Sequence, residues 1–286
     1  MLDSHVHLWD LTVRDQAWIP AGSPIRRTFG VSDLRSALAG TPVDSVILVQ
    51  ASNDAGETTD LISCAASEDL IRGVVGWADL RSPGVAAALS ALATTGWLLG
   101  LRHQALAEAD PAGWLRSPGV RRGLAALETA GLPFDLMIRP AHFPAALQAA
   151  RDHPSLQFVL DHLGKPPIAS GELEPWAAGI RALAAEPNVA CKLSGLQTIA
   201  SAGWTYAELA PYVDVAFDAF GPGRLIFGSD WPVSLSAASY PRVCEVAQVA
   251  CSGLSGPERA AMLAENARAI YRARCPPANR PILYES

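Results

Sequence analysis

The sequence predicts a single (β/α)8 TIM barrel that spans residues 1–286, and three observations support this fold class. Short, apolar, β-branched runs occur eight times and alternate with Ala- and Leu-rich stretches of helical periodicity. The runs are almost continuously apolar, which is typical of parallel strands that are buried on both faces. The chain length of 286 residues suits a barrel, for which about 250 residues is usual.

Each expected strand is a short run rich in Val, Ile, Leu or Phe. In chain order they are MLDSHVHLW (1–9), DSVILVQAS (44–52), IRGVVGWADL (71–80), WLLGLRHQ (97–104), LPFDLMIRP (132–140), LQFVLDHLGKP (156–166), NVACKLSGL (188–196) and GRLIFGSDWP (223–232). The intervening stretches, such as VAAALSALATTG, have apolar residues three and four positions apart and end in Gly or Pro, so they predict helices. The last helices are expected from about Pro241 to Arg274. No GxGxxG follows the first strand, which disfavours an open dinucleotide-binding sheet.

Composition narrows the class of partner to a small molecule. The chain has 22 basic and 28 acidic residues and no basic run, which argues against nucleic acid or an anionic membrane. Its five cysteines are scattered and never form CxxC, so we expect neither a disulfide framework nor a zinc ribbon. The beginning of the chain lacks the pattern of a signal peptide, and no apolar stretch is long enough to span a membrane. A cytoplasmic protein is expected.

Polar residues gather where the predicted strands end, and that end of a barrel holds the active site. They are His5, His7, Arg102, His103, Gln104, Asp161, His162, Lys165, Lys192, Ser194, Ser229 and Asp230. Residues two apart in a strand face the same side, so His5 and His7 point together and can reach one metal. The alternative is a pair of structural histidines. Ser194 and Ser229 lack a GxSxG motif, so a serine hydrolase is not expected.

Several of these residues admit two interpretations. Arg102 either pairs with a carboxylate inside the barrel or binds substrate, and His103 beside it faces the other side of a regular strand. Lys192 lies inside an apolar strand, where a lysine is costly unless it is paired or functional, which favours a site role. Asp161 is expected to face outward, and Lys165 is expected to be structural or solvated.

Two loops are candidates for substrate recognition. The connection over residues 10–33 is long, and long ordered loops often act as lids or binding loops. It contains Trp18, and the loop after the eighth strand contains Trp231. Both indoles could either stack on a sugar ring or pack in the core.

HVH in the first strand, LDHLGKP in the sixth and FGSDWP in the eighth resemble the amidohydrolase superfamily, and more closely its amidohydrolase family 2 branch. The resemblance runs from LDSHVHLW to ENARAIY. It implies a barrel hydrolase in which His5, His7 and His162 are metal ligands. Asp230 would be the general base and would also touch the metal.

The chain departs from the binuclear members of that family. The fourth strand ends in RHQ and offers no lysine as a bridging ligand, and the fifth ends without a histidine. His142 follows it, but at the start of a predicted helix. We therefore expect at most one divalent metal, with zinc the default for nitrogen and oxygen ligands. Metal-free catalysis stays open, because some lactonases of this branch work without a metal.

The resemblance implies a lactonase that opens a small sugar-acid lactone of the fuconolactone or rhamnonolactone type. The predicted catalytic residues are Asp230, His162 and Lys192, and the predicted substrate-binding residues are Arg102, His103, Trp18 and Trp231. Two alternatives are a metal-dependent decarboxylase of an aromatic or unsaturated acid and a non-catalytic barrel that serves as a binding protein. The particular lactone and the oligomeric state do not follow from the sequence.

Overall fold

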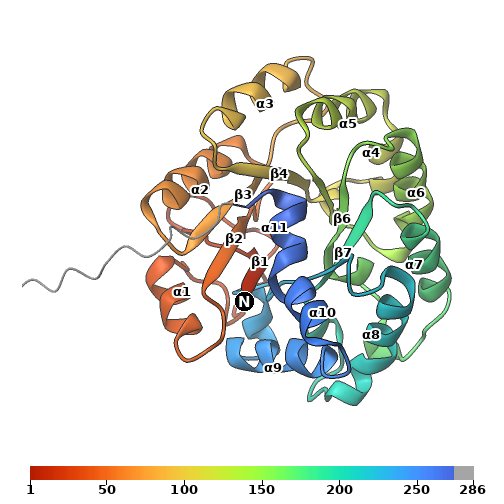
Figure 1. Cartoon of the computed structure of the whole chain (residues 1–286). Helices are drawn as coiled ribbons and strands as arrows, with labels where there is room; N and C mark the ends of the chain where they lie inside the picture. Colours follow the sequence, from red (N-terminus) through yellow and green to blue (C-terminus); the bar gives the residue numbers. More distant parts are fainter. Residues whose placement is uncertain (274–286) are drawn as a thin grey trace, which may run out of the picture.

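The structure, a computed structural model, describes residues 1–273. Residues 274–286, with Cys275, lie outside this range, so the predicted extent of a single domain over 1–286 stays a prediction. Eight parallel strands form one sheet in the order β1 to β8, and helices surround it (Figure 1). The predicted (β/α)8 barrel is therefore confirmed.

The ring closes between the last strand and the first. The backbone N–H of His7 donates to the carbonyl of Trp231 at 2.7 Å, and that of Asp230 donates to the carbonyl of His5 at 2.9 Å. Val6 and Trp231 form an isolated parallel bridge at the same place. These contacts bring the HVH segment of the first strand directly beside the GSDWP segment that follows the eighth.

Each predicted run contains one strand, and every strand residue is buried. The strands are β1 (Leu2–Val6), β2 (Ser45–Val49), β3 (Ile71–Gly76), β4 (Leu98–His103), β5 (Phe134–Leu136), β6 (Phe158–Leu160), β7 (Val189–Leu193) and β8 (Leu225–Phe227). The strands are shorter than the predicted runs because several of the polar residues at the run ends, such as His7, His162 and Asp230, lie beyond the last strand residue.

Helices follow the strands as predicted. They are α1 (Val31–Leu38), α2 (Ala55–Ser67), α3 (Val85–Ala93), α4 (Pro111–Arg116), α5 (Pro118–Ala130), α6 (Phe143–Asp152), α7 (Trp176–Ala184), α8 (Tyr206–Phe220), α9 (Tyr240–Ala250), α10 (Gly256–Ala260) and α11 (Asn266–Tyr271). Their ends follow ordinary capping chemistry. The carboxylate of Asp54 accepts from the N–H of Glu57 at the beginning of α2, and Gly131, with a φ of 65°, ends α5.

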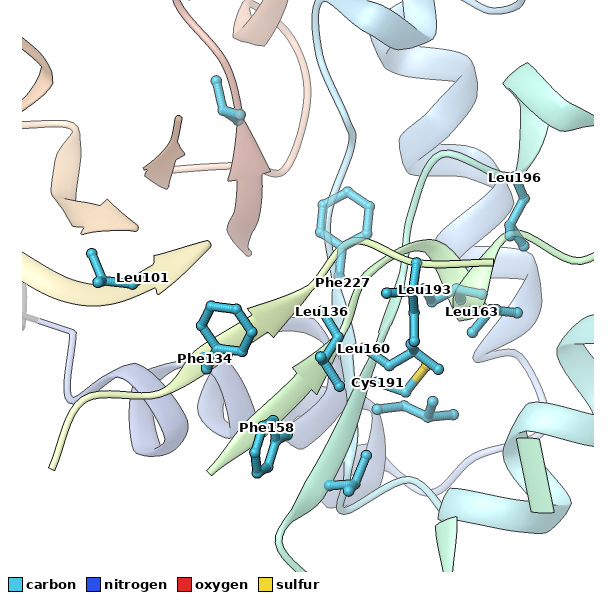
Figure 2. Packing of buried hydrophobic residues seen from close by; sticks show 14 of the residues in the cluster. Leu101, Phe134, Leu136, Phe158, Leu160, Leu163, Cys191, Leu193, Leu196 and Phe227 are labelled. Carbon is cyan, nitrogen blue, oxygen red and sulfur yellow. The ribbon is translucent and has the colours of Figure 1, made fainter. Parts of the chain in front are cut away.

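Two apolar clusters alternate along the strands. Phe134, Leu136, Phe158 and Leu160 point out from the sheet toward the surrounding helices (Figure 2). The residues between them point inward. This inner set belongs to a second cluster, formed by Leu2, Ile47, Val49, Val75, Leu99, Val159, Ile226, Ala264, Ala267, Tyr271 and Ala273. Helix α11 lies across the end of the barrel where β1 begins and completes this cluster (Figure 1).

The loop over residues 10–33 is pinned at its base and folded on itself. The backbones of Trp9 and Phe29 exchange two hydrogen bonds, of 3.1 and 2.9 Å. The guanidinium of Arg26 donates to the carbonyls of Gln16 and Ile19. The loop is therefore an ordered part of the rim, as a binding loop requires.

No helix in residues 1–273 combines the length and apolar character needed to cross a bilayer. The four cysteines within the described part of the chain are free thiols, in keeping with the prediction that no disulfide framework is present. They are Cys64, Cys191, Cys244 and Cys251.

Candidate active site

His5 and His7 both lie inside the barrel, as the HxH pattern predicted. Both are buried, and their ring centroids lie 4.9 Å apart. The register of β1 shifts after Asp3, whose carboxylate accepts hydrogen bonds from the backbone N–H groups of His5 and Ser229. This buried carboxylate therefore holds the distorted end of β1 against the end of β8.

Asp230 points toward the two histidines from the loop after β8. Its φ of 59° lies in the left-handed region, which is uncommon for a residue other than glycine. Its Oδ1 lies 3.4 Å from Nε2 of His7 and 3.7 Å from Nε2 of His5. Gly228 allows this approach, because a Cβ at that position would lie only 2.6 Å from the Cβ of His5.

His162 reaches the same place through a turn that follows β6. Residues 162–165 all have positive φ values, between 50° and 67°. The turn directs the imidazole of His162 to within 4.7 Å of that of His5, measured between ring centroids. Its Nδ1 lies 2.8 Å from the hydroxyl oxygen of Ser194 at the end of β7. Backbone strain of this kind is characteristic of functional sites.

The prediction that Asp161 faces outward is wrong. Val159 on β6 points into the barrel, and Asp161 continues the two-residue alternation of that strand. Its neighbour His162 would then point outward, but the left-handed turn rotates it back toward the lumen. Both side chains of the DH pair are consequently buried inside the barrel.

The structure thus brings together the four residues predicted from three separate strands, which we call the mouth cluster: His5, His7, His162 and Asp230. Burial lowers the pKa of all three imidazoles, and that of His162 falls to about 4. Burial would raise the pKa of Asp230, but electrostatic interaction with His162, a hydrogen bond from His7 and electrostatic interaction with His5 outweigh it and lower that pKa. Near pH 7 the cluster holds one carboxylate and three neutral rings.

Beneath the mouth cluster lies a second group, the inner cluster, formed by Asp135, Asp161, Lys192 and Tyr271. The ammonium of Lys192 contacts a carboxylate oxygen of Asp135 and lies 3.1 Å from Oδ1 of Asp161. The hydroxyl of Tyr271 donates to Asp135 at 2.7 Å. Lys192 Nζ also lies 3.1 Å from Nδ1 of His5, so the two clusters touch.

Two members of the inner cluster were missed from the sequence. Asp135 carried a readable signal, because an aspartate within a buried strand must find a partner. Tyr271 carried none, since it reaches β5 from α11, 136 residues away. Burial raises the pKa of Asp135 to about 6 even though Lys192 opposes the shift. Burial also acts to raise the pKa of Asp161, but Lys192 and His5 lower it well below its usual range.

Arg102, rather than His103, faces the lumen. Its Nη1 lies 3.2 Å from Nε2 of His5 and 3.3 Å from Oδ2 of Asp161. His103 points the other way. One of its ring nitrogens accepts from the indole N–H of Trp77 at 2.9 Å, and the other lies 2.9 Å from Oε1 of Glu108.

The mouth cluster can hold a metal ion. Ligand atoms of His5, His7 and Asp230 lie within 4.8 Å of one another, and so do those of His5, Asp161 and His162. Imidazole nitrogen and carboxylate oxygen are a ligand set that zinc accepts. Separations of 3.4 and 3.7 Å between Asp230 and the two histidines are close to the roughly 3.4 Å expected around a tetrahedral ion with bonds of about 2.1 Å.

Comparison with known proteins gives the family. The model of the Amidohydrolase family 2 group matches residues 2–273. The chain belongs to this amidohydrolase family. It is similar to L-fucono-1,5-lactonases of Burkholderia ambifaria and Burkholderia multivorans, each 37% identical. The alignments cover 95% of both chains for the first, and 94% of this chain and 95% of the relative for the second.

A solved structure is similar over nearly the same length. The crystal structure of an amidohydrolase from Burkholderia multivorans with bound zinc is 36% identical, with a TM-score of 0.88. The alignment covers 96% of this chain and 99% of that one. Family membership agrees with the resemblance based on the HVH, LDHLGKP and FGSDWP motifs.

The remaining predicted residues of this amidohydrolase lie around the rim. Trp18 is 43% exposed and packs edge-on against Trp9, with ring centroids 5.7 Å apart. Trp231 is buried and packs edge-on against Phe29 at 5.4 Å. His142 is half-buried, and its Nδ1 accepts a hydrogen bond from the backbone of a neighbouring residue just before α6.

Lys165 is half-buried and is the last residue of the left-handed turn that begins at His162. In the described part of the chain its ammonium has no hydrogen-bond or ion-pair partner. Burial lowers its pKa, and the nearby Asp230 opposes that shift, which places the two groups in the same region. The only other lysine of the chain is Lys192.

Proposed function

We propose that this amidohydrolase opens a small sugar-acid lactone of the fuconolactone or rhamnonolactone type by adding an activated water to the lactone carbonyl. One observation carries the proposal: the carboxylate of Asp230 is buried at the mouth of the barrel beside the imidazoles of His5, His7 and His162. The similarity to L-fucono-1,5-lactonases along 95% of the chain supports the same reaction class.

In the proposed reaction Asp230 is the general base. It accepts a proton from water as the water oxygen attacks the carbonyl carbon. The bond between that carbon and the ring oxygen then breaks, and the carboxyl group of Asp230 returns the proton to the ring oxygen. The product is the open hydroxy acid. A base positioned in this way contributes about 10²- to 10⁴-fold to the rate.

His162 is the proposed hydrogen-bond donor to the carbonyl oxygen. If the hydroxyl of Ser194 donates to Nδ1 of His162, the ring proton lies on Nε2, where it can face the substrate. A donor aimed at the developing oxyanion stabilises the tetrahedral intermediate. Arg102 is the second proposed donor, because its guanidinium lies inside the barrel beside His5.

We also propose one divalent metal, zinc by default, held by His5, His7 and either Asp230 or His162. When bound, such an ion supplies a Lewis acid and lowers the pKa of water. In catalysis without metal, the imidazoles of His5, His7 and His162 would orient the water while Asp230 serves as base.

The other predicted residues receive narrower roles. Lys192 is enclosed by two carboxylates, so we propose that it positions His5 and does not touch substrate. Trp18, with its exposed ring, is the proposed sugar-stacking residue. We propose that His103 and Trp231 support the rim, because both are buried against other side chains.

We further propose that the enzyme acts in cytoplasmic carbohydrate metabolism. Free thiols at four described cysteines suit a reducing compartment. The oligomeric state does not enter this proposal.

The test is a panel of aldono-1,5-lactones assayed with a pH indicator dye, because ring opening releases acid. We expect at least one lactone to open far faster than in buffer. The same preparation is then given benzoate-like acids, whose absorbance a decarboxylase would remove. Loss of that absorbance together with no lactone turnover would replace the proposal by the decarboxylase alternative, and no activity in either assay would favour the binding-protein alternative.

A further inference from the structure

The imidazole of His5 lies between two cations. Nε2 of His5 lies 3.2 Å from Nη1 of Arg102, and Nδ1 lies 3.1 Å from Nζ of Lys192. Arginine and lysine are donors only, whereas a neutral imidazole has one acceptor nitrogen. His5 can therefore accept a hydrogen bond from one of these two cations at a time.

The neighbouring carboxylates favour one tautomer of His5. With the proton on Nδ1, the ring can donate toward Oδ1 of Asp161 at 3.4 Å and accept from Arg102 at 3.2 Å. With the proton on Nε2, the ring can accept from Lys192 at 3.1 Å, but its N–H would face the N–H of Arg102, and the nearest carboxylate to that N–H, Asp230, is 3.7 Å away. The first tautomer has the nearer carboxylate, and Lys192, which then finds no acceptor on His5, still has Asp135 and Asp161 beside it. This tautomer places the lone pair of Nε2 against Arg102.

That lone pair is the one a metal ion would use. The Nε2 atoms of His5 and His7 surround Oδ1 of Asp230, so a metal bound to these three residues must accept the lone pair of His5 Nε2. In the favoured tautomer the guanidinium of Arg102 already donates to this nitrogen. One lone pair cannot serve both cations, and the positive charges of the arginine and the ion would also repel each other.

Arg102 is firmly held where it is. Its Nη2 donates to the backbone carbonyl of Gln50, and the side chain of Gln50 donates to the carbonyl of Arg102 at 3.1 Å. Its Nη1 also pairs with Asp161. The position of the guanidinium does not depend on His5. It can therefore stay beside Nε2 of His5 and compete with a metal ion for that nitrogen.

We propose that Arg102 and a divalent metal compete for Nε2 of His5, so that this arginine weakens metal binding at the mouth cluster. The inference concerns metal affinity and does not depend on which substrate the enzyme uses. It is therefore tested without substrate, and its failure is separate from failure of the proposed lactonase activity.

The experiment measures the zinc affinity of the metal-stripped full chain by competition with a chromophoric chelator. Arg102→Met keeps the length of the side chain and removes the charge and the donors, and we expect it to bind zinc roughly tenfold or more tightly than the wild type. Arg72→Met is the matched control, because Arg72 is also a buried arginine, at the beginning of β3. It should leave zinc affinity unchanged.

An equal or weaker zinc affinity in folded R102M would overturn the proposal. Should that variant fail to fold, Arg102→Lys serves instead, because its shorter side chain loses the contact with His5, and it too should bind zinc more tightly. A crystal structure of the wild type soaked with zinc gives an independent readout. We expect Nη1 of Arg102 to leave Nε2 of His5, and zinc on that nitrogen with the guanidinium still about 3.2 Å away would contradict the competition.

Discussion

The mouth cluster and the inner cluster are two buried polar sites in one barrel, and they differ in how their charges are satisfied. In the inner cluster Lys192 pairs with Asp135 and Asp161, and Tyr271 donates to Asp135. In the mouth cluster Asp230 has only imidazoles beside it, at 3.4 and 3.7 Å, and within residues 1–273 it has no Lys or Arg within ion-pair distance. The charged groups of the inner cluster are paired with one another. In the mouth cluster, the carboxylate and imidazole lone pairs stay available to bind a metal or to accept a proton.

The comparison predicts that substitutions in the mouth cluster reduce catalysis and spare folding, whereas substitutions in the inner cluster reduce stability first. Each of the following experiments therefore measures both turnover and the free energy of unfolding.

Asp230→Asn should show the largest effect. The amide keeps the shape of the side chain but cannot accept the proton from water, so kcat should fall about 10³-fold. The unfolding midpoint in urea should change little. Asp214→Asn, at an exposed position of α8, is the control and should match the wild type in both measurements. Turnover of D230N within about threefold of the wild type would remove the proposed general base.

Lys192→Met should have the largest effect on stability. It leaves the carboxylates of Asp135 and Asp161 buried without their shared cation, which typically costs about 3–5 kcal/mol. Urea unfolding measures this loss. Lys165→Met removes the other lysine of the chain, which has no ion pair within residues 1–273, and should cost under about 1 kcal/mol. Equal losses in the two variants would mean that the inner cluster is not a stabilising network.

Gly195→Ala tests how closely the mouth cluster is packed. Gly195 has a φ of 65°, and a Cβ there would lie 2.8 Å from both Oδ2 of Asp230 and Nδ1 of His162. A left-handed residue with a Cβ costs about 1–2 kcal/mol, and displacing reacting groups should lower kcat roughly tenfold or more. Gly171→Ala is the control, because Gly171 also has a left-handed backbone, with a φ of 73°, but a Cβ there would meet no neighbouring atom.

The two glycine variants share the backbone cost, so G195A should lose at least as much stability as G171A, and only G195A should lose turnover. If G171A loses as much kcat as G195A, the backbone rather than contact with the mouth cluster explains the effect.

Tyr271→Phe should reduce stability and leave turnover nearly unchanged. It removes the hydrogen bond to Asp135 but keeps the ring that closes the barrel, so the free energy of unfolding should fall by about 1.5–3 kcal/mol, the range for bonds to charged groups. Activity should change by less than about threefold, because Tyr271 touches no member of the mouth cluster directly. Tyr212→Phe loses only bonds to backbone carbonyls and should cost less. A larger loss in Y212F would contradict a charged inner cluster.

The sequence alone was enough for the architecture and for grouping four polar residues at one end of the barrel. Strand periodicity is local, so eight apolar runs located eight strands. Barrel topology then places the ends of all strands at one rim. For this reason the sequence pattern was enough to predict that His5, His7, His162 and Asp230 lie close together. The family motifs pointed to the same residues.

Local alternation failed at the strand ends. Asp161 faces inward because it continues the alternation of β6, and the left-handed turn over residues 162–165 then brings His162 inside as well, although adjacent strand residues normally face opposite sides. In β4 the alternation predicts that Arg102 and His103 face opposite sides of the strand, but the sequence does not show which of the two faces inward. That depends on the register of β4 against its neighbours.

What the sequence determined by itself is the set of elements and the chemistry available at the rim, because periodicity and residue type are properties of short segments. Only the tertiary structure decided which charges neutralise one another. Lys192 meets Asp135 across 57 residues, and Asp135 meets Tyr271 across 136. Such pairings arise when the sheet closes and α11 covers its end, and no short stretch of sequence encodes them.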